Sequence, residues 1–184
     1  KGKTLAILGL GRIGRLTARI AKYGFAMNVV GFGRRPFLDE ETSHFVDHYS
    51  ADLASAVSDA DFVSLHLSLT DQTKLLIDKK ALSLMSPRAI LINTSRGQLI
   101  HEGDLYDALS QNLIAGAGLD VFTNEPYRPV GGKDLRKLPN VICTPHISSN
   151  TDGANKRMGE ACVRNAQSFY DGKWEDLDLV PELR

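Results

Sequence analysis

Cysteine, excess charge and long apolar runs are all scarce in this sequence. Its 184 residues include two cysteines, Cys143 and Cys162, with no Cys-x-x-Cys pair or cysteine–histidine cluster near them, so we expect neither a disulfide framework nor a metal site. The formal net charge is zero, which gives no general attraction to nucleic acid. No run of 18 apolar residues and no signal peptide is present, so we expect a cytoplasmic protein without a membrane partner.

The sequence does contain a regular alternation of short apolar runs and helical patterns. Its composition, 42% hydrophobic and 24% charged, suits one compact domain over residues 1–184. The apolar runs predict six strands, at residues 4–8, 28–32, 61–67, 89–93, 115–121 and 140–144. The patterns between them predict helices near residues 13–23, 52–58, 79–84, 102–111 and 151–171. Strands that alternate with helices predict an α/β fold with a doubly wound parallel sheet.

A glycine-rich motif follows the first predicted strand and opens the first helix. Gly9, Gly11 and Gly14 have the G-x-G-x-x-G spacing of a dinucleotide pyrophosphate site. In such a site the first glycine permits a tight turn, the second lets the backbone approach the phosphates, and the third lets helix and strand pack closely. The free N–H groups at the helix start, around Arg12 and Ile13, would face the phosphates. We therefore expect a bound dinucleotide.

Arginines stand at the end of the second predicted strand, where many dinucleotide sites have an acid. That acid hydrogen-bonds the ribose 2′-hydroxyl of NAD about 20 residues beyond the glycines. Here Gly33 occupies the position, and Arg34 and Arg35 follow it. One arginine contact to a 2′-phosphate, at about 1.5 to 3 kcal/mol, corresponds to roughly a ten- to hundredfold preference. The pattern favours NADP, with NAD as the alternative if both arginines are ordinary surface charges.

Further polar residues also come directly after predicted strands. In open α/β sheets, ligands bind outside the carboxyl ends of the strands. The residues at these ends are Gly9, Gly11, Arg34, His66, Arg96, Asp120 and His146. Since parallel strands end at one edge of a sheet, we expect all of them along one edge.

Five motifs in register resemble the nucleotide-binding domain of the D-isomer-specific 2-hydroxyacid dehydrogenases, of the glyoxylate/hydroxypyruvate reductase type. Besides the glycine motif they are HLSLTDQT (66–73), INTSRG (92–97), GLDVFTNEP (118–126) and TPHISSNT (144–151). The resemblance implies a Rossmann fold and hydride transfer between a nicotinamide and C2 of a small 2-keto or 2-hydroxy acid. It also implies a homodimer and a second, substrate-side domain. Because the segments of that domain are absent from this sequence, we expect little activity from the chain alone.

The resemblance assigns roles residue by residue. Arg96 would bind the substrate and border the cofactor, His146 would be the acid and base, and Glu125 would be the carboxylate partner of the histidine. Asp120 would hold the nicotinamide amide. The remaining positions that would line the cofactor are His66, Leu67, Thr73, Thr94 and Ser95.

The chemistry of these residue types agrees with the implied roles. Arginine offers a planar fork that suits the carboxylate and carbonyl of a 2-keto acid. Reducing the carbonyl leaves an alkoxide that must gain a proton, and histidine paired with a carboxylate can supply it near neutral pH. Each residue taken singly, Arg96, Glu125 or His146, could equally be an ordinary loop residue. All three at strand ends, in the family order, make that reading improbable.

Some residues depart from the family pattern or lack such company. Ser68 stands where the family commonly has a proline. The other histidines, His44, His48 and His101, lie outside the motifs, so we expect them at surface or packing positions. The apolar positions Leu16 and Ile20 of the first helix are expected in the core.

Two other functions compete with the dehydrogenase. A short-chain dehydrogenase would use the same glycine motif, but no tyrosine here has a lysine four residues later. A non-enzymatic NAD(P)H-sensing module of the corepressor type resembles the same family and can retain the arginine, glutamate and histidine. Only turnover distinguishes it from an enzyme, and the sequence does not name the 2-hydroxy acid.

Overall fold

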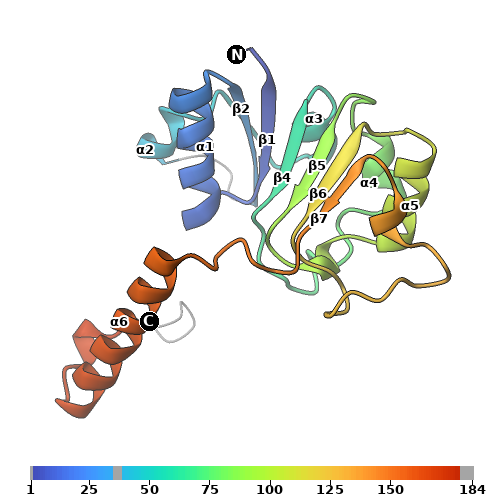
Figure 1. The fold of residues 1–184 in the computed structure, drawn as a ribbon. Helices are drawn as coiled ribbons and strands as arrows, with labels where there is room; N and C mark the ends of the chain where they lie inside the picture. The colour runs from blue at the N-terminus through green and yellow to red at the C-terminus, as the bar shows by residue number, and fades with distance from the viewer. Residues whose placement is uncertain (1, 35–38, 179–184) are drawn as a thin grey trace. The chain divides into compact units, whose positions relative to one another are not determined.

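The chain forms two compact units, Lys1–His146 and Ile147–Arg184. A computed structural model describes residues 2–34 and 39–178 (Figure 1). The first unit contains the sheet and its core, whereas the helix of the second unit has no buried residue. That residues 1–184 are one dinucleotide-binding domain stays a prediction.

A seven-stranded parallel sheet, in the order β3-β2-β1-β4-β5-β6-β7, forms the centre of the first unit. The strands are β1 (Thr4–Leu8), β2 (Asn28–Phe32), β3 (His48–Ser50), β4 (Phe62–Leu65), β5 (Ile90–Asn93), β6 (Gly116–Leu119) and β7 (Val141–Cys143). All six predicted strands are confirmed to within a few residues. The sequence analysis missed β3, because three residues with one apolar side chain are too short to show a period. β3 is a strand because it pairs with β2 in the sheet, and its local residue pattern does not indicate one.

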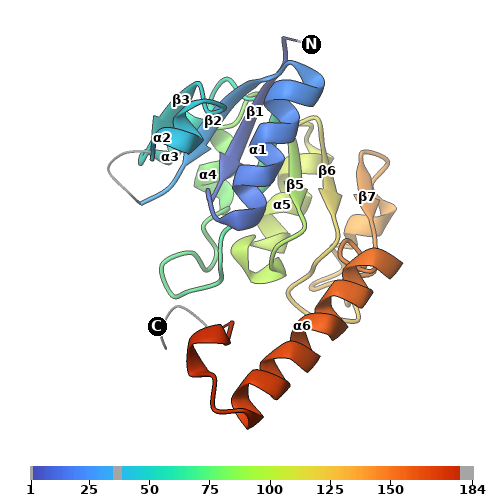
Figure 2. The same ribbon diagram turned by 90° about the vertical axis from the view of Figure 1, so that its left-hand side faces the viewer.

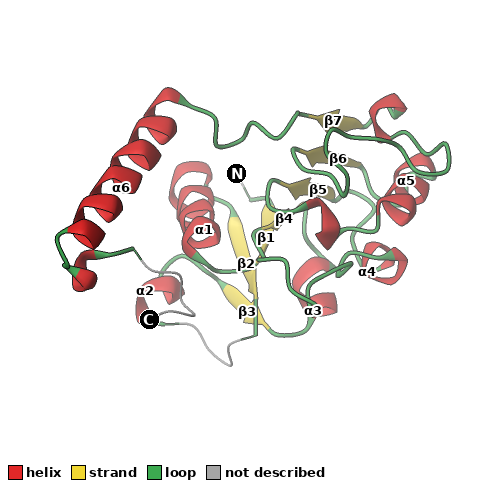
Figure 3. Ribbon diagram, turned by 90° about the horizontal axis from the view of Figure 1, so that it is seen from below, coloured by secondary structure: helices red, strands yellow, loops and turns green. Residues whose placement is uncertain are grey.

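Helices cover both faces of the sheet, as the doubly wound prediction requires. Helix α1 lies against one face, and α3, α4 and α5 lie against the other (Figure 3). The bounds are α1 (Arg12–Phe25), α2 (Glu40–Ser43), α3 (Leu53–Val57), α4 (Lys79–Ser83), α5 (Glu102–Ser110) and, in the second unit, α6 (Asp152–Tyr170). Short 3-10 turns are Gly97–Leu99, Leu135–Lys137 and Trp174–Asp176. The four-residue α2 was not predicted.

The two faces of β1 show how the layers pack. Leu5 and Ile7 belong to the core beneath α1, together with Ala18 and Ala21 of that helix. Ala6 and Leu8 belong to the larger core on the opposite face. Residues 5–8 of this central parallel strand are thus all apolar, because both faces of the strand are covered (Figure 2).

The prediction that Leu16 and Ile20 lie in the core is wrong, because they are 58% and 52% exposed. Helix α1 buries small residues instead, namely Gly14, Ala18 and Ala21. Small side chains let the helix axis come close to the sheet, so the larger apolar residues are left on the outer face. The helix therefore has an apolar stripe on each side, and the sequence pattern does not indicate which one is buried.

The described part of the chain has neither a membrane-spanning helix nor a cluster of metal-ligand side chains. No helix of residues 2–34 or 39–178 is long and apolar enough to cross a bilayer. In the same ranges no three His, Cys, Asp or Glu side chains are grouped as metal ligands. A cytoplasmic location stays a prediction.

Core packing leads to a first test. Leu91 of β5 is 0% exposed, so we expect Leu91→Ala to lower the free energy of unfolding by about 2 to 5 kcal/mol. The matched substitution Leu16→Ala, on the outer face of α1, should change it by no more than about 0.5 kcal/mol. Urea unfolding followed by circular dichroism measures both. Equal losses for the two variants would show that the outer face of α1 is buried in solution.

Candidate active site

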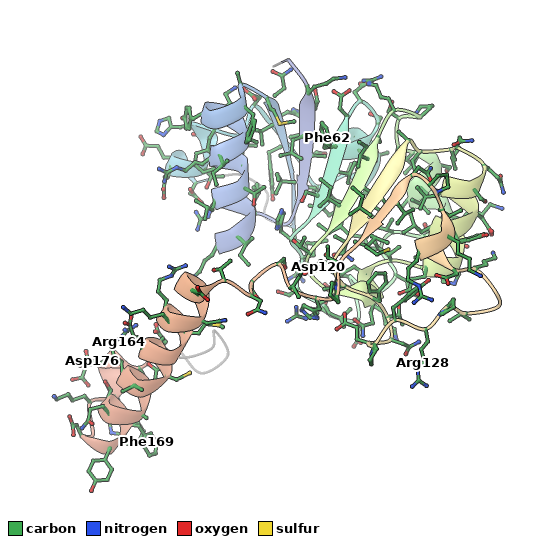
Figure 4. The ribbon with its side chains drawn as sticks, viewed as in Figure 1. Phe62, Asp120, Arg128, Arg164, Phe169 and Asp176 are labelled. Carbon is green, nitrogen blue, oxygen red and sulfur yellow. The ribbon has the colours of Figure 1, made fainter. Side chains whose placement is uncertain are left out.

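The carboxyl ends of the parallel strands bring the predicted site residues to one edge of the sheet, as expected. Asp120 lies at this edge, directly after β6 (Figure 4). Gly9 and His66 directly follow β1 and β4, and Arg34, Arg96 and His146 follow β2, β5 and β7 within three residues.

Two of the three motif glycines are required by the protein itself. Gly9 has φ +104°, and a Cβ there would lie 2.8 Å from the carbonyl carbon of His66. A Cβ on Gly14 would lie 2.0 Å from the carbonyl oxygen of Gly9. Gly11 differs, because a Cβ there would meet no atom within 4 Å. Nothing in the described fold requires glycine at position 11, which is what a site kept open for a ligand would show.

The N-terminus of α1 is an electropositive end without a capping side chain. The helix begins at Arg12, its N-cap Gly11 makes no side-chain cap bond within the described structure, and its first turn contains no acid. The Ile13 side chain is 70% exposed beside it. Free N–H groups and the helix dipole both favour an anion at this point.

A side chain at position 33, at the end of β2, would have to displace the hydroxyl group of Tyr49. A Cβ on Gly33 would lie 2.8 Å from the hydroxyl oxygen of Tyr49 on β3. The exposed Arg34 donates a hydrogen bond of 2.6 Å from Nη1 to Oε1 of Gln72. Arg35 lies outside the described residues. The nearby positive charge described here is therefore that of Arg34.

The loop after β4 is held in shape by its own hydroxyl groups. The Thr73 hydroxyl donates to the carbonyl oxygen of Ser68 at 2.6 Å, so Thr73 fixes the loop in which Ser68 replaces the usual proline. His66 Nε2 lies 3.0 Å from the Ser64 hydroxyl, and burial lowers the pKa of its ring. The Leu67 carbonyl accepts a 2.6 Å hydrogen bond from the Ser95 hydroxyl, which ties this loop to the next one.

The loop that carries Arg96 is held by a fully buried amide. Asn93, 0% exposed, donates from Nδ2 to the carbonyl oxygen of Arg96 at 2.9 Å and accepts from the N–H of Ser95 at 3.0 Å. Thr94, between them, is exposed. The sequence analysis did not select Asn93, although a polar residue that ends the apolar run AILIN was a usable signal.

The Arg96 loop packs tightly against the segment after β6. A Cβ on Gly97 would lie 1.9 Å from the carbonyl carbon of Phe122, so no side chain fits there. Glu102 accepts a 2.6 Å hydrogen bond from the N–H of Thr123 and steadies the same segment. No sequence signal pointed to Glu102, because its partner is 21 residues away.

Glu125 and His146 are hydrogen-bonded to each other. His146 Nδ1 lies 2.7 Å from Oε2 of Glu125, and Oε1 of the same carboxylate accepts from the N–H of Phe122 at 3.0 Å. The hydrogen bond from His146, and then that from Phe122, holds the pKa of Glu125 below its usual value. His146 has φ +56°, a conformation rare for a residue with a side chain and frequent at functional sites.

Asp120 is buried beside this pair. It is 3% exposed and accepts a 2.5 Å hydrogen bond from the Thr144 hydroxyl of the TPH motif. A bond from β7 to β6 thus fixes the carboxylate at the edge of the sheet.

One cavity brings the three predicted catalytic residues together. Arg96, Glu125 and His146 all line a cavity of about 210 Å³. Its other walls are Gly97, Gln98, Val121, Phe122 and Thr123. A larger cavity of about 620 Å³ also borders Glu125 and His146, but Arg96 is not part of it. We take the smaller cavity as the candidate active site, because it combines the cation with Glu125 and His146, which the larger cavity does not.

The Glu125–His146 pair predicts a measurable titration. Because His146 is the main cause of the low pKa of Glu125, we expect His146→Ala to raise that pKa towards the ordinary value of 4.5. Carbon NMR of the labelled carboxylate measures it. His101→Ala, which removes a ring that pairs with Asp104 instead, should leave the Glu125 pKa unchanged. An unshifted Glu125 in His146→Ala would show that the pair does not form in solution.

The lowered pKa of Glu125 also predicts how the stability of the fold changes with pH. A carboxylate with a lowered folded-state pKa stabilises the fold above its unfolded pKa, and this contribution is lost as the pH falls through the folded value. The wild type should therefore lose the Glu125 contribution at acid pH, and His146→Ala should keep only the smaller part that comes from the Phe122 N–H.

Comparisons with known proteins place this site in a family. A family model described as the NAD binding domain of D-isomer specific 2-hydroxyacid dehydrogenases matches residues 1–148. A glyoxylate reductase of Thermococcus litoralis is 43% identical over 175 residues, which are 94% of this chain and 50% of that protein. The chain thus spans about half the length of the curated relatives it matches.

Solved structures agree with the sequence comparison. A glyoxylate reductase from Paecilomyes thermophila has a TM-score of 0.88 at 34% identity, over 100% of this chain and 54% of the other. An acyclic imino acid reductase in complex with NADPH and D-Arg has a TM-score of 0.83 at 32% identity, over 97% of this chain and 54% of the other. The chain therefore belongs to the D-isomer-specific 2-hydroxyacid dehydrogenase family, in which it corresponds to the NAD-binding domain.

Proposed function

We propose that this chain is the dinucleotide-binding part of an oxidoreductase that transfers a hydride between NADP(H) and C2 of a small D-2-hydroxy acid. The observation that carries the proposal is the single cavity lined by Arg96, Glu125 and His146 at the carboxyl edge of the sheet. The family model supports the class of reaction. Full activity belongs to the complete protein, since relatives are about twice as long.

The residues at the glycine turn fit a dinucleotide. The uncapped N-terminus of α1 offers N–H groups to a pyrophosphate, and Gly11 leaves its approach open. His66, Leu67, Thr94 and Ser95 belong to the loops after β4 and β5, on the other side of this turn. We assign these loops to the walls of the cofactor site and Asp120 to the nicotinamide amide.

The residues of the cavity divide the chemistry among them. The nicotinamide, when bound, supplies or accepts the hydride. Arg96 would hold the carboxylate and the carbonyl of the keto acid with its planar fork. His146 would give a proton to the alkoxide oxygen from Nε2, since Nδ1 is bonded to Glu125. Glu125 would stabilise the imidazolium and keep the ring oriented.

NADP is the cofactor we favour over NAD. The family model is described as an NAD-binding domain, and one structural neighbour is complexed with NADPH, so family membership leaves the choice open. Position 33 is a glycine beside the Tyr49 hydroxyl and offers no carboxylate to a ribose 2′-hydroxyl, and Arg34 supplies a cation nearby. Both features suit a 2′-phosphate better than a 2′-hydroxyl.

The substrate we favour is a small 2-keto acid such as glyoxylate or hydroxypyruvate. The matched relatives include a glyoxylate reductase and a glyoxylate/hydroxypyruvate reductase B. The family's homodimer stays a prediction for this chain.

Cofactor choice is tested by titrating the chain with NADPH and with NADH, followed by the fluorescence of the reduced nicotinamide. We expect roughly a tenfold or greater preference for NADPH, because one charged hydrogen bond to the 2′-phosphate is worth that much. Arg34→Ala should abolish the preference, whereas Arg19→Ala, an exposed arginine of α1, should preserve it. Equal binding of the two cofactors would assign the protein to NAD.

Catalysis is tested in the complete protein that carries this chain, with glyoxylate or hydroxypyruvate as substrate. We expect His146→Gln to lower kcat by roughly 10²- to 10⁴-fold, the usual contribution of a general acid, with NADPH affinity within about twofold of wild type. Glu125→Gln should lower kcat less. A wild-type protein that binds the dinucleotide but turns over no 2-keto acid would instead be a sensor of the corepressor type.

A further inference from the structure

One hydrogen bond joins the two loops that flank the glycine turn. Strand β1, which leads into the glycines, has β2 and β4 as its two neighbours in the sheet. Arg34 follows β2, and Gln72 lies in the loop after β4. The 2.6 Å bond between their side chains therefore spans the edge of the sheet at the end of β1.

The side-chain partner of Arg34 is a neutral amide. Arg15, Arg88 and Arg136 each form an ion pair with an aspartate. Among residues 2–34 and 39–178, no ion pair within 4.0 Å joins Arg34 to a carboxylate. This holds although an acidic residue, Asp71, directly precedes Gln72 in the sequence. The charge of Arg34 is thus held in place without being neutralised.

We infer that Gln72 is a specificity-determining residue of the cofactor site. Its amide oxygen holds the guanidinium of Arg34 at the edge of the sheet and leaves the positive charge available to a 2′-phosphate. This inference rests on the proposed dinucleotide site and deepens it, because it gives a role to a residue on a different loop from the arginines.

The chemistry of the side chains supports this role. A guanidinium has five N–H donors, so a single bond to Gln72 leaves the others for phosphate oxygens. A glutamate at position 72 has nearly the same shape but would form a charged pair with Arg34 and would repel the phosphate. An alanine would leave the charge intact but remove the contact that orders a long, exposed side chain.

The test compares dissociation constants for NADPH and NADH in the wild type, Gln72→Glu, Gln72→Ala and Arg34→Ala. We expect Gln72→Glu to weaken NADPH binding roughly tenfold, the order of one charged contact, and to change NADH binding by less than about twofold. Gln72→Ala should weaken NADPH binding by roughly two- to fivefold, which is of the order of a neutral hydrogen bond.

Two controls separate this role from general effects. Gln111→Glu changes the net charge equally at an exposed position at the end of α5, so it should leave both constants unchanged. In an Arg34→Ala background, Gln72→Ala should cause no further loss of NADPH affinity, because Gln72 acts through the arginine. Circular dichroism and thermal unfolding show whether each variant is folded.

The outcomes distinguish the inference from the proposal beneath it. If the wild type prefers NADPH through Arg34 but Gln72→Glu leaves the NADPH/NADH ratio unchanged, the role of Gln72 is overturned and the cofactor proposal stands. If the wild type shows no preference, or Arg34→Ala has no effect on it, the NADP proposal fails and the role of Gln72 fails with it.

Discussion

Parallel pairing of all seven strands is the constraint on which the site depends. Each parallel strand must be followed by a crossover, so every strand ends at the same edge of the sheet. Residues as distant in sequence as Gly9 and His146 are brought to that edge without any direct contact being specified between them. Their side chains differ in role, but one backbone arrangement places them all.

Bonds between loops then convert a shared edge into a cavity. The Asn93 side chain binds the backbone carbonyl of Arg96 and so holds the Arg96 loop. Gly97 lets that loop touch the segment after β6, and Glu102 of α5 binds the same segment. The Glu125–His146 bond closes the other side. A cation and an acid–base pair thus line one small volume, where a keto acid would meet both. The positive φ of His146 indicates that its backbone is held in a rarely populated conformation, which keeps the side chain beside Glu125.

At the end of β2, contacts between segments likewise shape the proposed cofactor site. Tyr49, from the short strand β3, fills the space beside Gly33, and Gln72, from the loop after β4, holds Arg34. The arginines in the sequence indicated a cation at this point. Only the structure shows that Tyr49 and Gln72 lie next to this segment. Specificity in our proposal therefore comes from two loops and strand β3, although only the loop after β2 was visible in the local pattern.

The sequence by itself determined the strands, most of the helices, the glycine turn and the motif residues, because apolar periodicity and glycine spacing are local properties of the chain. Tertiary structure decided which face of α1 is buried, where small Gly14 and Ala18 displaced Leu16 and Ile20 to the surface. It also decided the strand β3 and the roles of Asn93, Glu102 and Gln72 as loop partners. Those contacts join segments that only folding brings together, so no local pattern carries them.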